Sequence, residues 1–88
     1  MSFLHDREYL SSGDVVQVES SHQCNVLVLD DTNFARYRRG ERFEYFGGFY
    51  QRFPANISVP RTGYWNVTLD LGGGSATIRH GIRYLKAG

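Results

Sequence analysis

The sequence is poor in cysteine, proline and long apolar runs, and each shortage excludes a class of protein. Cys24 is the only cysteine in 88 residues, so the chain can form neither an internal disulfide nor a cysteine cluster for zinc. No apolar stretch approaches the about 18 residues of a membrane-spanning helix, and the first residues lack the pattern of a signal peptide. We therefore expect a cytosolic protein that does not act at a membrane, with Cys24 as a small core residue.

The sequence also has no large excess of positive or negative charge. Ten lysines and arginines oppose nine acidic residues, which leaves a formal net charge of +1. A chain so close to neutral lacks the cationic field of a general nucleic-acid or membrane-surface binder. Nine of the ten basic residues are arginines, which favours bidentate pairing or ring stacking over a diffuse positive field.

Catalytic signatures are missing as well. His5, His22 and His80 lie in three separate segments, and no Gly-x-Ser-x-Gly, His-Glu-x-x-His or Cys–His pattern occurs. The Gly-Gly-Gly run at residues 72–74 precedes neither a helix start nor a Lys-Ser/Thr pair, so it indicates a hairpin turn rather than a phosphate loop. We expect a protein that is not an enzyme and that needs no cofactor and no metal.

What the sequence does contain is a series of short alternating segments separated by turn-forming residues, a pattern typical of β-strands. Residues 3–10 fit either a strand or a rough helical stripe. The turn-forming run Ser-Ser-Gly-Asp at residues 11–14 and the strand pattern at residues 15–19 favour a strand–turn–strand unit. Residues 24–29 are apolar on both faces, as in a central strand that is buried on both sides.

Further strands are predicted at residues 42–46, 56–59 and 64–71. A last strand is predicted from residues 76–79 to 82–85, with Gly81 as a candidate position for a kink. The pair Gly47-Gly48 indicates a bulge or tight bend. In the strand over 64–71 the alternation assigns four residues to the core and four to the outer face. The core-facing residues are Trp65, Val67, Leu69 and Leu71, and the outward-facing residues are Tyr64, Asn66, Thr68 and Asp70.

Together these segments predict one domain over residues 1–88, all-β, a jelly-roll-like antiparallel β-sandwich of seven or eight short strands with one short helix. The expected core consists of Val16, Val18, Val26, Val28, Phe43, Tyr45, Ile57, Val59, Trp65, Val67, Leu69 and Ile78.

The stretch from Asp30 to Gly48 differs from this scaffold. Residues 34–39 predict a helix of one to two turns, capped by Asp31 or Thr32 and ended by Gly40. The polar run at residues 30–33 also offers oxygen ligands for calcium, to which Asp70 would add one if the fold brought it near, but its spacing matches no defined calcium loop. Helix capping accounts for the same residues.

Eight of the thirteen aromatic residues lie within residues 34–53, and Arg36, Arg38, Arg39 and Arg42 are interleaved with them. Rings together with guanidinium groups are the chemistry of single-strand nucleic-acid and sugar-phosphate binding. Glu41 and Glu44 neutralise part of this charge, and the core of a small sandwich needs many of the rings. We predict a ligand-binding surface here, with Arg38, Arg39 and Arg42 as anion contacts. The candidate site residues are Arg36, Tyr37, Arg38, Arg39, Phe46 and Tyr50.

An alternative use of the same aromatic residues is contact with protein. In this hypothesis the chain is a structural or protein-interaction domain, and its exposed rings and edge strands form a homo-oligomer or bind a partner.

The order of the motifs resembles a bacterial family of domains of unknown function, DUF1883. The resemblance covers nearly the whole chain and rests on five segments in combination: LSSGDVVQV (10–18), NVLVLD (25–30), NF with Tyr37 and Gly40, YFGG (45–48), and PRTGYWNV with LDLGG (60–73). Two departures are Tyr64 in place of the expected His and Gly74 after the usual Gly-Gly turn. The family includes small stand-alone proteins and modules fused to TIR-type signalling domains, which implies a compact binding or regulatory module. More loosely, the strands resemble the jelly-roll sandwich of bacterial pre-peptidase and carbohydrate-binding-type domains, a likeness of fold that does not determine function.

Overall fold

The computed structural model describes residues 3–70 and 79–87, and in these residues seven strands and one helix follow one another. Their order is β1 (Phe3–Leu10), β2 (Val15–Ser20), β3 (Cys24–Asp30), α1 (Asp31–Arg39), β4 (Phe46–Tyr50), β5 (Ala55–Ser58), β6 (Gly63–Asp70) and β7 (His80–Leu85). The strand–turn–strand prediction for the first 19 residues is confirmed by β1 and β2.

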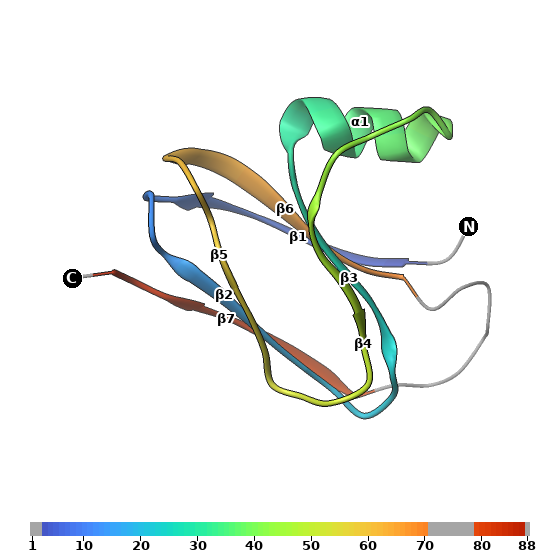
Figure 1. Cartoon of the computed structure of the whole chain (residues 1–88), viewed down its shortest axis with the longest axis vertical. Helices are drawn as coiled ribbons and strands as arrows, with labels where there is room; N and C mark the ends of the chain where they lie inside the picture. The colour runs from blue at the N-terminus through green and yellow to red at the C-terminus, as the bar shows by residue number, and fades with distance from the viewer. Residues whose placement is uncertain (1–2, 71–78, 88) are drawn as a thin grey trace.

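The strands form two antiparallel sheets, with the helix outside them (Figure 1). The four-stranded sheet has the order β1-β6-β3-β4, and the three-stranded sheet has the order β5-β2-β7. Successive strands mostly change sheet, as in jelly rolls, and only β3 and β4 are neighbours both in sequence and in one sheet. The predicted all-β sandwich with one short helix is confirmed.

The main core lies between the two sheets. Its buried residues are Leu10, Val16, Val18, Cys24, Val26, Val28, Ala55, Ile57, Val59, Trp65, Val67 and Leu69. Nine of these were expected in the core list and Cys24 was expected as a separate small core residue. Two predicted core residues differ: Tyr45 is 46% exposed, and Phe43 is only partly buried, against the cluster under the helix. Ile78 lies outside the described residues.

Strand β3 is buried on both faces, as predicted. Val26 and Val28 point into the main core, whereas Leu27 and Leu29 form a second cluster with Tyr37 of the helix. This second cluster exists because α1 packs against the outer face of the four-stranded sheet. The same cover makes one prediction wrong: Asn66 and Thr68 of β6, expected to face solvent, are fully buried.

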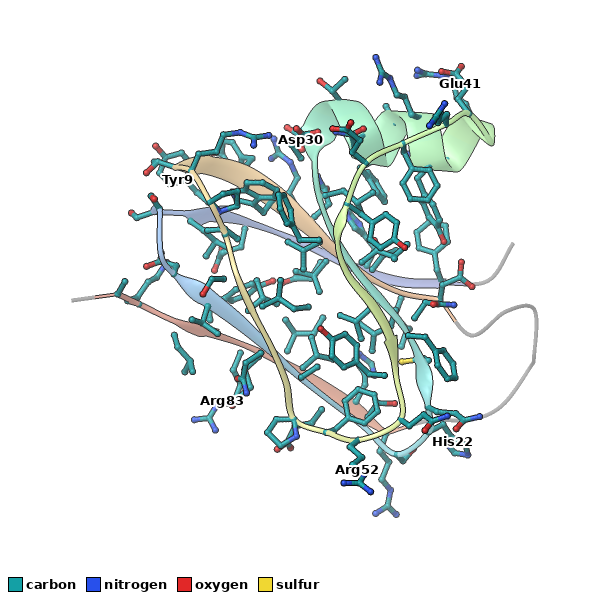
Figure 2. All side chains as sticks on the ribbon, in the orientation of Figure 1. Tyr9, His22, Asp30, Glu41, Arg52 and Arg83 are labelled. Atoms are coloured by element: carbon teal, nitrogen blue, oxygen red, sulfur yellow. The ribbon has the colours of Figure 1, made fainter. Side chains whose placement is uncertain are left out.

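Helix α1 begins at Asp31, three residues before its predicted start at residue 34. The N-cap is Asp30, not Asp31 or Thr32, and its side chain accepts a hydrogen bond from the backbone N–H of Asn33 at 2.8 Å. Gly40 ends the helix as predicted, in the left-handed conformation with φ of 73°. Asp30 therefore lies at the start of the helix and Glu41 beyond its other end (Figure 2).

The strand predicted over residues 42–46 is wrong, because residues 41–45 carry no regular structure and β4 begins only at Phe46. Gly47 and Gly48 belong to this edge strand instead of bending away from it. Gly47 has φ of +114°, and a Cβ added there would lie 2.1 Å from the carbonyl oxygen of Val26. Only glycine allows β4 to approach β3 in this way.

Some predictions fall on residues that the structure does not describe. These are the core position Leu71, the glycine turn at residues 72–74 and the start of the last strand at residues 76–78. Within the described residues, no helix is long and apolar enough to cross a membrane.

Candidate ligand-binding cleft

A cleft of about 430 Å³ opens beside the start of the helix. Three segments meet there. They are the end of β3 with the first turn of α1, residues 43–46, and residues 61–65, which lead into β6. The lining residues are Val28, Leu29, Asp30, Asn33, Phe43, Glu44, Tyr45, Phe46, Arg61 and Trp65.

The pairing of β3 with β6 assembles the floor of this cleft. The register places Asp30 opposite Trp65, so Arg61, four residues before Trp65, lies next to Asp30. The Nη2 atom of Arg61 donates to Oδ2 of Asp30 at 2.6 Å, and the guanidinium carbon lies 4.9 Å from the centre of the Trp65 ring. The Trp65 Nε1–H donates to the carbonyl oxygen of Arg61 at 3.1 Å. Backbone and side chain together hold Arg61 over Trp65.

Aromatic residues form the wall. Tyr45 is 46% exposed and Phe46 is 43% exposed, and the rings of Phe46 and Trp65 form a T-shaped pair with centres 6.0 Å apart. Phe43 and Tyr45 have ring centres 5.6 Å apart. The backbone N–H of Glu44 donates to Oδ1 of Asn33 at 2.9 Å, which ties this irregular segment to the helix.

Asp30, Arg61 and Trp65 also line a second, more open hollow of about 300 Å³, together with residues 31–32 and 62–64. The Asp30–Arg61 ion pair is therefore common to two adjacent depressions. A change in the position of the Arg61 side chain alters the shape of both.

Of the six predicted site residues, only Phe46 lines the cleft. Arg36, Arg38 and Arg39 are exposed on the helix, where Arg38 and Arg39 line a separate small hollow with Ala35. Arg39 pairs with Glu41 at 2.8 Å, and this hydrogen bond raises the pKa of Arg39 and lowers the pKa of Glu41. The structure thus separates Arg38 and Arg39, which line this hollow, from the exposed rings of Tyr45 and Phe46, which line the cleft.

The two remaining predicted residues, Tyr37 and Tyr50, are largely withdrawn from solvent. Tyr37 is 5% exposed and packs between the helix and the four-stranded sheet. Its hydroxyl donates to Oδ2 of Asp70 at 2.6 Å, and burial together with this hydrogen bond raises the pKa of Tyr37 well above its ordinary value. Tyr50 is partly buried against the main core, with its ring centre 6.4 Å from that of Phe53.

A polar network joins β1 and β6 to the first turn of the helix. Arg7 donates two hydrogen bonds to the carboxylate of Asp31, at 3.0 and 2.7 Å, and Asn66 donates to the same carboxylate at 2.8 Å. These hydrogen bonds lower the pKa of Asp31 to about 2, and those from Arg7 have the larger effect. The His5 ring stacks on Phe34 at 4.2 Å and forms a hydrogen bond with Asn66 at 2.8 Å. The network accounts for the burial of a polar residue in the middle of β6.

The polar run at residues 30–33 is engaged in these contacts. Asp30 caps the helix and pairs with Arg61, while Asp31 pairs with Arg7. Among the described residues, no group of three or more His, Cys, Asp or Glu side chains is placed to hold a metal ion.

The sequence did not reveal the partnership of Arg61 with Asp30. Arg61 lies in a predicted turn, 31 residues from Asp30, and only the β3–β6 register brings the two together. A weak signal existed: Asp30 ends a strongly apolar strand, and Trp65 belongs to the clearest alternating strand. Pairing these two strands antiparallel places the loop before one beside the end of the other.

The comparisons with known proteins gave one finding. A family model described as "Domain of unknown function (DUF1883)" matches residues 1–87 of the chain. Neither the curated proteins nor the solved structures gave a match.

Proposed function

The chain belongs to the DUF1883 family of domains of unknown function, and we propose that it is a non-enzymatic, cytosolic binding module whose ligand occupies the cleft beside the helix start. One observation carries this proposal: two large rings, Tyr45 and Phe46, stand exposed beside a half-exposed ion pair in a depression of about 430 Å³. Small-molecule sites have volumes of roughly 300–1,000 Å³ and combine apolar walls with a few polar groups.

The non-catalytic part of the proposal is supported by the cleft lining. It includes no histidine, cysteine, serine or lysine among the described residues, so it has neither a serine or cysteine nucleophile nor a histidine acid–base group. Of its two carboxylates, Asp30 already accepts hydrogen bonds from Asn33 and Arg61, and Glu44 has no histidine, serine or cysteine beside it in the lining. The side chains of the cleft are therefore better suited to binding a ligand than to catalysing a reaction.

Amide chemical-shift mapping of ¹⁵N-labelled protein tests the proposal. The panel contains sugars, nucleotides, carboxylic acids and organic cations, and binding is expected to shift the amides of residues 43–46 and 61–65. The double variant Tyr45→Ala with Phe46→Ala is expected to weaken any such binding about tenfold or more, because stacking platforms contribute on the order of 1 kcal/mol each.

The matched control is Phe49→Ala. Phe49 is 55% exposed on the same strand as Phe46 and does not line the cleft. Equal loss of binding in the control and in the double variant contradicts the cleft as the site. A panel in which no compound shifts the cleft amides contradicts a small-molecule role.

A second candidate function is protein interaction through the four-stranded sheet. Tyr9 and Tyr64 form an exposed cross-strand pair on β1 and β6, with ring centres 5.1 Å apart, and Arg7 lies 3.9 Å over Tyr64. Aromatic residues and arginine are enriched at protein interfaces, and β1 is an edge strand of its sheet.

Light scattering distinguishes this function from the first. Self-association through this face predicts a mass above the monomer that Tyr9→Ser with Tyr64→Ser returns to the monomer value, whereas Tyr45→Ala with Phe46→Ala leaves it unchanged. A wild-type protein that stays monomeric at every concentration excludes the homo-oligomer.

A further inference from the structure

The charge of the cleft is opposite in sign to that of the helix surface. Three ionisable side chains of fixed charge line it: Asp30, Glu44 and Arg61. Asp30 and Arg61 neutralise each other, and the Glu44 carboxylate has no ion-pair or hydrogen-bond partner among the residues that the structure describes. The lining therefore carries one uncompensated negative charge. An anionic ligand is repelled at this place, and a cation is attracted.

The rings around Glu44 favour the same sign of ligand. Phe43 and Tyr45 flank it in sequence and Phe46 follows, so three aromatic side chains and one carboxylate come from four consecutive residues. The face of an aromatic ring is negative because of its quadrupole, and it attracts a cation held within about 6 Å of the centre. The three rings and the carboxylate of Glu44 therefore both favour a cationic ligand.

Arg61 shows this recognition within the chain itself. Its guanidinium lies over one ring, Trp65, at 4.9 Å, and donates to one carboxylate, Asp30, at 2.6 Å. Asp30 and Trp65 are thus already occupied by a cation from the protein. Glu44, Tyr45 and Phe46 are groups of the same kinds, and among the described residues no cationic side chain pairs with Glu44 or lies over the rings of Tyr45 and Phe46.

We propose that the cleft binds a small organic cation, carrying a quaternary ammonium or guanidinium group, with Phe43, Tyr45 and Phe46 around the cation and Glu44 as its counter-ion. This inference rests on the proposed binding function and names the chemical class of its ligand. Both groups are weakly hydrated, so they lose little solvation when aromatic rings replace water. Arg61 competes with the ligand for the electrostatic field of Asp30 and for space.

Chemical-shift titration with a matched pair of probes tests the charge. The pair is choline and its neutral isostere, in which a tert-butyl group replaces the trimethylammonium group; methylguanidine serves as the second cation. We expect choline or methylguanidine to bind at the amides of residues 43–46 at least about fivefold more tightly than the neutral isostere. Equal affinity for choline and its isostere overturns the inference.

Substitution of the proposed counter-ion tests its position. Glu44→Gln is expected to weaken cation binding about two- to fivefold while leaving the weak binding of the neutral isostere unchanged. The control is Glu19→Gln, which removes an exposed carboxylate from β2 of the other sheet. Equal effects of the two substitutions point to a general charge effect and overturn the assignment of Glu44.

Arg61→Met gives the sharpest test, because the two signs of ligand predict opposite results. If the ligand is a cation, removal of the competing guanidinium frees Asp30 and uncovers Trp65, and affinity rises several-fold. If the ligand is an anion, Arg61 is its main contact and affinity falls. The double variant Tyr45→Ala with Phe46→Ala is expected to weaken cation binding about tenfold or more in either background.

The outcomes separate this inference from the proposed function. Binding of neutral or anionic compounds at residues 43–46, with no preference for cations, overturns the cation class and leaves the cleft as a binding site. Absence of shifts at the cleft with every compound, cations up to about 50 mM included, overturns both.

Discussion

The hydroxyl of Tyr37 donates a hydrogen bond to Oδ2 of Asp70 at 2.6 Å, and this bond fastens helix α1 to strand β6. The helix is only nine residues long, too short to be stable in isolation, so it depends on such contacts. Tyr37 supplies an apolar ring to the cluster with Leu27 and Leu29 and a polar anchor at the tip of the ring. Because the cleft uses Asp30 and Asn33 of the helix start, the position of the helix determines the shape of the site.

Tyr37→Phe removes the anchor and keeps the ring. We expect a loss of about 1.5–3 kcal/mol in the free energy of unfolding, the usual value for a hydrogen bond to a charged acceptor, measured by urea denaturation. Tyr37→Ala is expected to cost about 3–5 kcal/mol, because it also leaves a cavity. Tyr9→Phe, at an exposed tyrosine, is the control and is expected to change little. A Tyr37→Phe variant as stable as the wild type contradicts the role of the hydroxyl.

The close approach of β4 to β3 gives a second prediction. Gly47→Ala places a methyl group against the Val26 carbonyl oxygen at a backbone φ of +114°, where L-residues are strained. We expect it to destabilise the domain by about 2 kcal/mol or more and to shift the amide signals of residues 43–46, since β4 must move away.

The control is Gly81→Ala on β7, where an added Cβ meets no atom within 4 Å. It is expected to change the stability by less than about 0.5 kcal/mol. Equal effects of the two substitutions indicate that β4 can shift without cost, and then the glycine requirement at residue 47 is wrong.

Much of the scaffold was predictable because its signals are local. Alternation of apolar and polar residues identified β2 and β6, and the two-sided apolar pattern of residues 24–29 identified a strand buried on both faces. Gly40 fixed the end of the helix because its left-handed conformation is a property of a single residue. These features depend on neighbours in sequence, which the pattern contains.

The errors arose where distant segments decide. Alternation assigned Asn66 and Thr68 to solvent, since it shows that β6 has two faces and does not show that a helix covers the second one. Residues 42–46 alternate as a strand does, but no strand pairs with residues 41–45, so Tyr45 remains exposed. An alternating pattern buries a side chain only when the segment pairs with other strands in a sheet.

The candidate site was less predictable than the fold. Aromatic density directed attention to residues 34–53, but it did not separate Phe46, which lines the cleft, from Tyr37, which is buried under the helix. The ion pair of Asp30 with Arg61 depends on strand register across 31 residues. Long-range register follows from the packing of the whole sheet and leaves no mark within either segment.

Two carboxylates make the stability dependent on acid. Asp14 is buried and accepts backbone N–H bonds from Ala87 and Ser11, both at 2.8 Å, which lower its pKa below the ordinary 3.8. The hydrogen bonds from Arg7 and Asn66 lower the pKa of Asp31 to about 2. The folded state therefore binds these protons more weakly than the unfolded state, and stability falls as the pH falls through about 4 to 2.

Urea denaturation at a series of pH values measures this fall. Asp14→Asn is expected to be less stable than the wild type at neutral pH, with the difference shrinking as the pH falls, because protonation removes the same charge from the wild type. Asp31→Asn is expected to show the same convergence at lower pH. A stability difference that stays constant down to pH 2 contradicts the assignment.

Thr68 leads to a substitution that should stabilise the domain. Its side chain is fully buried, and its Oγ1 atom has no hydrogen-bond partner among the described residues. The register places it between His5 of β1 and Leu27 of β3, on the face that the helix covers. A buried hydroxyl without a partner loses its hydrogen bonds to water and gains none in the protein, so its burial is unfavourable. Thr68→Val keeps the shape of the side chain and removes that cost.

We expect Thr68→Val to raise the free energy of unfolding by about 0.5–1.5 kcal/mol, measured by urea or thermal denaturation. Asn66→Val, two residues away on the same face, is the matched control. Asn66 is hydrogen-bonded to His5, Asp31 and the Leu29 carbonyl, so its replacement is expected to cost about 2 kcal/mol or more. Opposite signs at the two sites mean that burial of a polar group on this face is tolerated only through its partners. A destabilised Thr68→Val protein means that the hydroxyl has a partner, and the cover of the helix over β6 then differs from the one described.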